Sequence, residues 1–180
     1  MSNMKVLRPH QFEAVIEAEA ASLKLINLPT GTGKSLIQSR LISRDIIRRK
    51  EANERPGVYV IFTPRILLCN QLLKEAQLDL YEQGLFNFRI LMVHSGRGIE
   101  RVLEEQWKDH ASHASRYTKI SCTTTHADIR LNYRQATNLN EPLIICSTYD
   151  SADRVRDSNI EIDMVLCDEA HYTVSSSELG

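Results

Sequence analysis

The stretch LPTGTGKS, residues 28–35, joins a short apolar run to a long segment of helical period. The apolar run at 23–28 has the length of a buried strand, and the segment at 35–50 repeats apolar residues on one side and arginines on the other. Gly31 and Gly33 allow backbone angles and a close approach that a side chain would block. A strand, a glycine-rich turn and a helix in this order predict a loop that wraps an anion with its own amide groups.

Outward from this loop, short apolar runs continue to alternate with longer segments of helical period. Further strands are predicted at 58–63, 88–93, 143–147 and 164–167, and further helices at 9–20, from Pro64 onward and at 149–157. This alternation is typical of an α/β fold with a mostly parallel sheet and helices on both faces. Residues 99–140 are less regular, and we expect a polar surface elaboration there with helices at about 99–110 and 126–138.

The bulk composition fits one domain and excludes some classes of protein. The 180 residues are 42% apolar, and 22 Lys and Arg face 23 Asp and Glu, so any phosphate-binding surface must be local. There is no apolar run near the roughly 20 residues of a membrane span, and the first residues lack the apolar core of a signal peptide. The four cysteines form no CxxC pair. We expect a soluble intracellular protein with reduced thiols and no membrane partner.

The side chains of the loop suit a nucleotide triphosphate with Mg²⁺. Lys34 supplies a mobile cation for the β- and γ-phosphates, and the Ser35 hydroxyl can ligate the ion. Leu28 stands where the strict GxxxxGK[ST] pattern has its first glycine, so the match is incomplete. The alternative is a glycine-rich turn with an incidental Lys-Ser. The residues predicted to bind the nucleotide here are Pro29, Thr30, Gly31, Thr32, Gly33, Lys34 and Ser35.

The segment VLCDEAH, residues 165–171, places carboxylates directly after a predicted strand. Asp168 is the candidate metal-side residue, and Glu169 is the candidate base that orients and deprotonates the attacking water. An acidic pair in this position can also do no more than cap a following helix. His171 completes the candidate catalytic set, although a turn histidine is the plainer interpretation. This prediction requires folding to bring Lys34 beside the two carboxylates.

With both elements in place, the chain resembles the superfamily 2 helicases of the DEAH group, which includes restriction-enzyme translocase subunits and viral helicase-like ATPases. The resemblance covers almost all of the chain and implies that residues 1–180 form a first RecA-like, ATP-binding domain. LRPHQ at 7–11 is similar to the upstream element by which this family recognises adenine, which implies adenine contacts for Gln11 and Arg8. From the residues alone, Gln11 is an ordinary surface residue at the start of a helix.

Three further segments resemble the motifs by which the family contacts the nucleic-acid backbone: FTPRILLCNQ at 62–71, CSTYDS at 146–151 and, more loosely, 95–98. Each of the first two follows a strand and precedes a helix, with Thr63 and Ser147 or Thr148 as possible caps, so each helix start can receive a phosphate or be a cap and nothing else. Contacts of this kind do not read bases. The implied contact residues are Pro64, Arg65, Ser95, Gly96, Arg97, Thr148 and Tyr149.

The family's next strand, which follows the acidic motif, does not appear before Gly180, and neither does a second RecA-like domain. In the family that strand lies between the strands of the loop and of the acidic motif, so we expect an incomplete sheet and a fragment or split product of a longer motor. The predicted function is Mg-dependent ATP hydrolysis coupled to movement on DNA, with RNA left open. The alternative is a nucleotide-binding interaction module without turnover. A histidine and cysteine set matches zinc spacings poorly, and solvated histidines are the better interpretation; it comprises His110, His113, Cys122 and His126.

Overall fold

A computed structural model describes residues 6–23, 25–26, 31–94 and 119–170 of the chain. The helices are α1 (Pro9–Glu19), α2 (Lys34–Glu51), α3 (Ile66–Glu82), α5 (His126–Leu139) and α6 (Ala152–Asp157), with a 3₁₀ turn, η2 (Tyr149–Ser151). The strands are β1 (Val58–Thr63), β2 (Arg89–Val93), β3 (Lys119–Thr123), β4 (Leu143–Thr148) and β5 (Met164–Cys167). The α/β fold expected from the alternation of strands and helices is confirmed.

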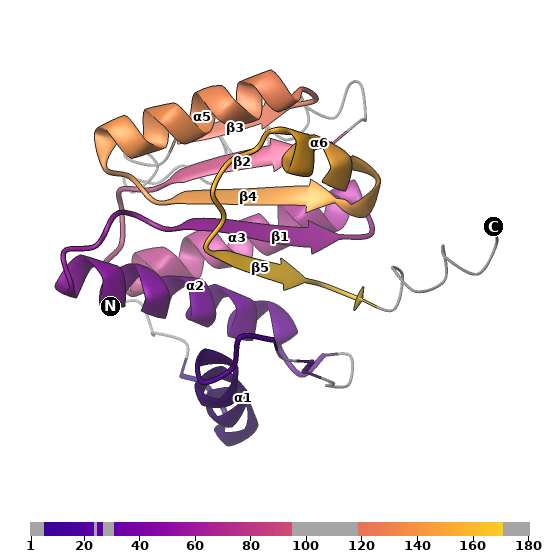
Figure 1. Ribbon diagram of the computed structural model, residues 1–180. Coiled ribbons are helices and arrows are strands. Elements are labelled where there is room, and N and C mark those ends of the chain that lie inside the picture. The colour runs from indigo at the N-terminus through magenta and orange to yellow at the C-terminus, as the bar shows by residue number, and fades with distance from the viewer. Residues whose placement is uncertain (1–5, 24, 27–30, 95–118, 171–180) are drawn as a thin grey trace.

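The five strands form one parallel sheet in the order β3-β2-β4-β1-β5. Helices α2 and α3 cover one face and α5 and α6 the other, while α1 packs against α2 (Figure 1). Alternate residues of β1 enter the two cores: Tyr59 and Ile61 join the cluster under α2 and α3, and Val58 and Val60 join the other. This burial on both faces explains why the central strands are continuous apolar runs.

All carboxyl ends of the strands lie at one edge of the sheet, and α2 begins at that same edge (Figure 1). Ligands of open α/β sheets bind outside the carboxyl ends of the strands. The opposite edge holds β5 in place through Asp163. Its carboxylate accepts hydrogen bonds from the Val58 amide at 2.8 Å, from Arg49 at 2.9 Å and from Arg55 at 2.8 Å. The acidic motif therefore follows a strand whose first end is held by the hydrogen bonds of Asp163.

The polar elaboration expected at 99–140 is only partly a surface feature. Its second half forms β3 and α5, which complete one side of the main sheet. The strand escaped prediction because it is an edge strand, with Ile120 exposed and few apolar residues. The helix expected at 126–138 is confirmed as α5, and the helix expected at 99–110 lies outside the described residues.

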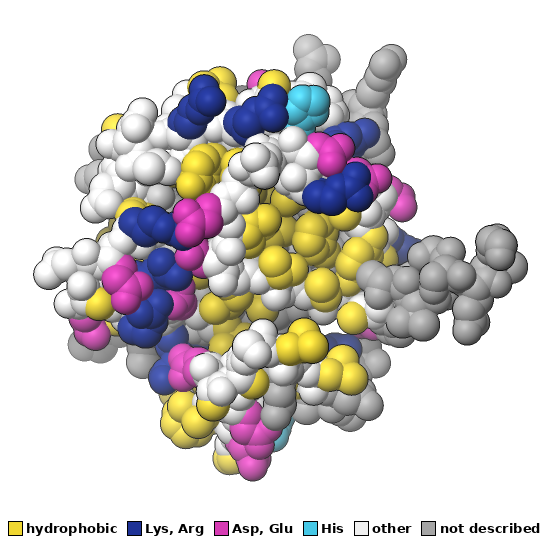
Figure 2. Space-filling model, viewed as in Figure 1, with side chains coloured by type: hydrophobic (Ala, Val, Ile, Leu, Met, Phe, Trp, Pro, Cys, Tyr) yellow, Lys and Arg dark blue, Asp and Glu magenta, His cyan; other side chains and the backbone are white. Residues whose placement is uncertain are grey.

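The strand predicted at 23–28 was wrong for the residues that the structure describes there. Leu23 is 91% exposed and Leu25 is 82% exposed, and neither is in a strand. A strand forms where a neighbour pairs with its backbone, but within the described ranges β5, the strand on this side, pairs with β1 alone. Val165 on β5 is exposed, and apolar side chains gather between α6 and α1 on this face of the molecule (Figure 2).

Candidate nucleotide site

The glycine-rich loop ends at the start of α2, as the sequence predicts. Gly31 and Gly33 have φ angles of +78° and +83°, and Gly33 is the N-cap residue of the helix. Lys34 and Ser35 are therefore the first two helical residues, whose amide groups have no partner within the helix. Together with the positive end of the helix dipole, these amides make the loop suitable for an anion. Pro29 and Thr30 lie outside the described residues.

Gln11 binds the loop from outside, which corrects its interpretation as an ordinary surface residue. The residue is only 4% exposed. Its Nε2 donates to the Thr32 carbonyl at 2.7 Å, and its Oε1 accepts from the amide of Arg8, an exposed residue, at 2.8 Å. A Cβ added at Gly33 would overlap Gln11 Nε2, so this contact requires a glycine. The sequence LRPHQ indicates this role, because Pro9 is the first residue of the helix and Gln11 is the third, the position that a glutamine takes in a capping box.

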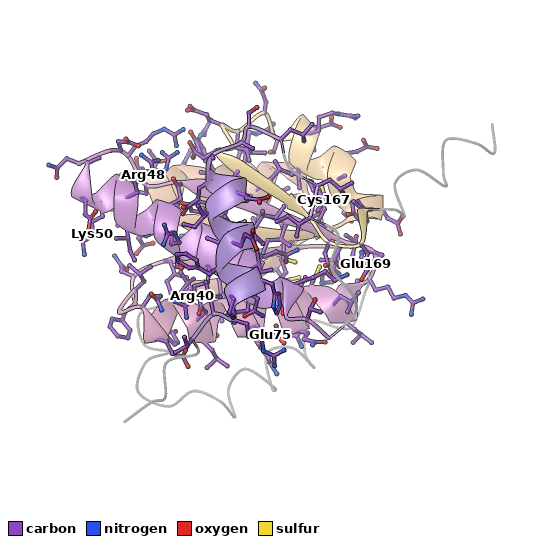
Figure 3. The ribbon with its side chains drawn as sticks, turned by 90° about the horizontal axis from the view of Figure 1, so that it is seen from below. Arg40, Arg48, Lys50, Glu75, Cys167 and Glu169 are labelled. Atoms are coloured by element: carbon purple, nitrogen blue, oxygen red, sulfur yellow. The ribbon has the colours of Figure 1, made fainter. Side chains whose placement is uncertain are left out.

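The acidic motif meets the loop at the end of β5. The Asp168 amide donates to the Phe62 carbonyl at 2.8 Å and so continues the pairing of β5 with β1. The next residue, Glu169, accepts a hydrogen bond from Lys34 Nζ at 3.3 Å, and both side chains are 30% exposed. Figure 3 shows Glu169 directly after β5, whereas Lys50 lies at the far end of α2. Two segments 135 residues apart thus share one small region.

The Asp168 carboxyl lies in a place that suits a cation. Burial raises its pKa, the neighbouring Glu169 charge raises it further, and Lys34 and a hydrogen bond from the Gln38 side chain only partly oppose this. Gln38 Oε1 is itself buried and has no hydrogen-bond partner among the described residues. Gln38 was not singled out in the sequence, although it stands four residues after Lys34 and so on the same face of α2.

The side chains of the last residue of β4 and of the residue after it point inward. The Tyr149 hydroxyl donates to the Asp168 carbonyl at 2.7 Å, and its ring stacks on Phe62 with 6.0 Å between centroids. Burial raises the pKa of the Tyr149 phenol. Thr148 is buried, and its hydroxyl donates to Ser151 Oγ at 3.2 Å. Both hydroxyls are thus engaged in hydrogen bonds within the fold.

The segment after β1 differs from the predicted cap. The helix α3 begins at Ile66 with Arg65 as its N-cap residue, so Pro64 precedes the helix. The Thr63 hydroxyl is buried and donates to the Arg65 carbonyl at 2.9 Å, which fixes the turn instead of capping the helix. The Arg65 side chain is exposed at this edge. The predicted residues Ser95, Gly96, Arg97 and His171 lie outside the described residues.

The zinc alternative gains no support. No group of three or more possible metal ligands occurs within the described ranges. Cys122 instead lies 2.9 Å from the ring of His94, a fully buried residue that follows β2, and His126 is exposed at the start of α5. His110 and His113 lie outside the described part of the chain. The structure has all four cysteines free.

The sheet and the position of the glycine loop define a RecA-like α/β domain. The model of the family described as "Type III restriction enzyme, res subunit" matches residues 4–179, and the chain belongs to this family. The family is one of superfamily 2 helicase domains, contains ATPases and implies nucleotide binding, which confirms the resemblance to restriction-enzyme subunits.

A solved structure supports the same fold. It is a nuclease-deletion mutant of the Type ISP restriction-modification enzyme LlaGI in complex with a DNA substrate mimic, with a TM-score of 0.66 and 23% identity over 93% of the present chain. The chain spans 15% of the length of that protein. No curated protein matches the sequence. Within the described ranges, every helix is too short or too polar to cross a membrane.

Proposed function

We propose that this chain is the first RecA-like, ATP-binding domain of a DNA-dependent ATPase that moves on DNA. The observation that carries the proposal is the 3.3 Å contact between Lys34 Nζ and the Glu169 carboxylate, which joins the anion loop to the acidic strand end. Phosphoryl transfer to water needs charge neutralisation and a positioned water more than covalent chemistry. A cation, a half-buried carboxyl and a second carboxylate at one helix start supply those needs.

The nucleotide would bind with its phosphates at the start of α2. Lys34 would then exchange the Glu169 carboxylate for phosphate oxygens, which leaves Glu169 free to accept a proton from water. Gln11 uses one N–H for the Thr32 carbonyl and one oxygen lone pair for the Arg8 amide. Its amide keeps a second N–H and a second lone pair, the pair of groups that an adenine edge requires. Arg8 and His171 complete the proposed set.

The residues fit a magnesium ion. Mg²⁺ prefers carboxylate, hydroxyl and water oxygens, and Asp168 and Ser35 supply the first two kinds. Gln38 Oε1, which has no hydrogen-bond partner among the described residues, is an acceptor for a coordinated water, and burial and the Glu169 charge raise the pKa of Asp168, which a bound cation would lower. When bound, the ion would neutralise phosphate charge.

The proposed nucleic-acid surface lies beside this site. It comprises Thr148 at the end of β4 with Tyr149 after it, and Pro64 and Arg65 after β1. The two strands are neighbours in the order β2-β4-β1-β5. The third predicted segment, 95–97, follows β2 in the sequence. A backbone that crosses three neighbouring strand ends would therefore reach the strand that carries the acidic motif. DNA is the proposed track because the LlaGI structure contains a DNA substrate mimic.

We further propose that a longer protein completes the domain. Two observations on the described residues support this proposal: β5 pairs there with β1 alone, and Leu23, Leu25 and Ile26 are in no strand. A motor cycle also needs a second domain that closes on the nucleotide.

The test is ATP hydrolysis and nucleotide binding by the full-length protein, with and without single-stranded DNA. Lys34→Ala should weaken nucleotide binding about 10- to 100-fold, because it removes charge-assisted hydrogen bonds to phosphate. Glu169→Gln should keep binding and lower turnover at least about 100-fold. Lys50→Ala, at the other end of α2, is the matched control (Figure 3). Binding with no turnover on any DNA would instead favour a nucleotide-binding interaction module.

A further inference from the structure

Both hydrogen-bonding groups of the Asp168 main chain are held by the same aromatic pair. Its amide donates to the carbonyl of Phe62, and its carbonyl accepts from the hydroxyl of Tyr149. The two rings stack with an interplanar angle of 19°. The acidic motif is thus tied to β1 through one residue and to the turn after β4 through the other.

The Tyr149 hydrogen bond fixes a peptide group whose orientation matters. The carbonyl of Asp168 belongs to the peptide that leads into Glu169, which has a φ angle of +52°. A non-glycine residue in this left-handed region costs about 1 kcal/mol and persists where its surroundings hold it. Because the hydroxyl holds the peptide from one side, it also sets the direction from which the Glu169 carboxylate reaches Lys34.

Tyr149 is also the first residue of η2, directly after β4. The turn is closed by its own hydrogen bonds, since Ser151 Oγ accepts from the hydroxyl of Thr148 at 3.2 Å and from Arg154 at 2.9 Å. A ligand that presses on the main chain of this turn would therefore move the Tyr149 side chain with it, and the Asp168 carbonyl lies at the end of that side chain.

We propose that Tyr149 is a positioning residue that transmits backbone contact at the end of β4 to the orientation of Glu169. The inference rests on the proposed function and deepens it, because it names the side chain through which nucleic acid regulates the nucleotide site. Nucleic acid and nucleotide then alter each other's affinity by one shared factor, as thermodynamic linkage requires.

The experiment measures that factor in the full-length protein. The dissociation constant of a fluorescent, non-hydrolysable ATP analogue is measured with and without saturating single-stranded DNA, and the constant for DNA with and without the analogue. Tyr149→Phe keeps the ring and removes the hydroxyl, and should lower the coupling factor about 2- to 10-fold, the worth of one hydrogen bond. Because the hydroxyl is engaged with the Asp168 carbonyl, any loss of DNA affinity without nucleotide should be smaller than the loss of coupling, and turnover at saturating DNA should fall. A purely structural role would not produce this pattern.

Two further variants serve as controls for this interpretation. Tyr81→Phe removes a hydroxyl that accepts a hydrogen bond from Gln77 at 2.8 Å on α3, and should leave the coupling factor unchanged. Phe62→Leu disturbs the stacking while Tyr149 keeps its hydroxyl, and should lower the coupling partly.

The inference is overturned if Tyr149→Phe weakens DNA binding while coupling persists, since the hydroxyl would then contact phosphate directly. Unchanged coupling and unchanged affinities overturn it as well. If the unsubstituted protein binds nucleotide and DNA without coupling, only the role of Tyr149 fails. If it binds neither, the proposed function fails first.

Discussion

The two edges of the sheet use acidic residues in opposite ways. At the amino edge, Asp163 accepts hydrogen bonds from Arg49, Arg55 and the Val58 amide, so its charge is fully paired. At the carboxyl edge, the half-buried Asp168 lies beside another acid, Glu169. The first arrangement stabilises the fold. The second places two carboxyls side by side with Lys34, and it is the arrangement that we propose receives a ligand.

The pKa values of the carboxyl groups also differ between the two edges, with a lowered value at the amino edge and a raised value at the carboxyl edge. Burial pushes the pKa of Asp45 upward, but hydrogen bonds from Arg49, Arg48 and Tyr59 hold it below its usual value. Burial and Glu169 raise the pKa of Asp168, and nothing offsets them fully. Carboxyls with raised pKa values in a cleft are candidates for function, and carboxyls with lowered values in ion pairs more often serve stability.

The backbone shows the contrast again. Among the described residues, four turns that lead toward the amino edge have positive φ angles, and all use asparagine or glycine, which tolerate that region: Asn53, Gly84, Asn140 and Asn159. At the carboxyl edge the corresponding residue is Glu169, which has no such tolerance. The strain at that position is consistent with a requirement for a carboxylate there.

The largest expected effect lies at the amino edge. Asp163→Ala should destabilise the fold by about 3 kcal/mol, because it leaves two arginines and an amide without their shared acceptor. Urea unfolding followed by circular dichroism measures the change. Glu161→Ala is the control: Glu161 contacts the same Arg55 at 2.7 Å but is 66% exposed, so its loss should cost under about 0.5 kcal/mol. Equal effects of the two substitutions would contradict the contrast between the edges.

Substitutions of the two loop glycines should have smaller effects on the free energy of unfolding, and the two effects should differ. Gly31→Ala meets no atom within 4 Å and should cost only the backbone term of about 1 kcal/mol. Gly33→Ala also collides with Gln11 Nε2 and should cost about 1 kcal/mol more, as it breaks the bond to the Thr32 carbonyl.

Gly84→Ala, with a φ angle of +75° and open space around it, controls for the backbone term. Thermal unfolding measures stability, and titration with an ATP analogue measures binding, which should weaken more for Gly33→Ala than for Gly31→Ala. Indistinguishable loop variants would show that Gln11 does not support the loop.

Much of the fold could be predicted because strands that are buried on both faces consist mainly of apolar residues. The central strands β1 and β4 are covered on both faces, so VYVIFT and LIICST are continuous apolar runs. The edge strand KISCT is not a continuous apolar run, and it was missed. The run at 23–28 is also apolar, yet its described residues form no strand, since apolar content shows what a segment can bury but not whether a neighbour pairs with its backbone.

The candidate site was predictable to a similar extent. The glycine loop and the acidic motif are local patterns, and their residues do meet at Lys34 and Glu169. The burial of Gln11 and the bond from Tyr149 to Asp168 depend on long-range contacts. The second follows from the neighbouring positions of β4, β1 and β5, which no local pattern encodes.

The smallest expected effect is a gain in stability, whereas the substitutions above are expected to destabilise the fold. In the absence of nucleotide, Asp168→Asn should stabilise the fold at pH 7, by about 1 to 3 °C in Tm, since partial exposure limits the gain. Because the pKa of Asp168 is raised in the folded protein, its contribution to stability is fully present below the unfolded value and is lost as the pH rises through the folded value. The difference between variant and parent should therefore disappear at about pH 3. Asp45→Asn should do the reverse, with a loss at pH 7 that shrinks as the pH falls through the lowered pKa of Asp45. A Tm that falls for Asp168→Asn at pH 7 would mean that the carboxyl edge is paired as well as the amino edge, and the distinction between a stabilising edge and a binding edge would be lost.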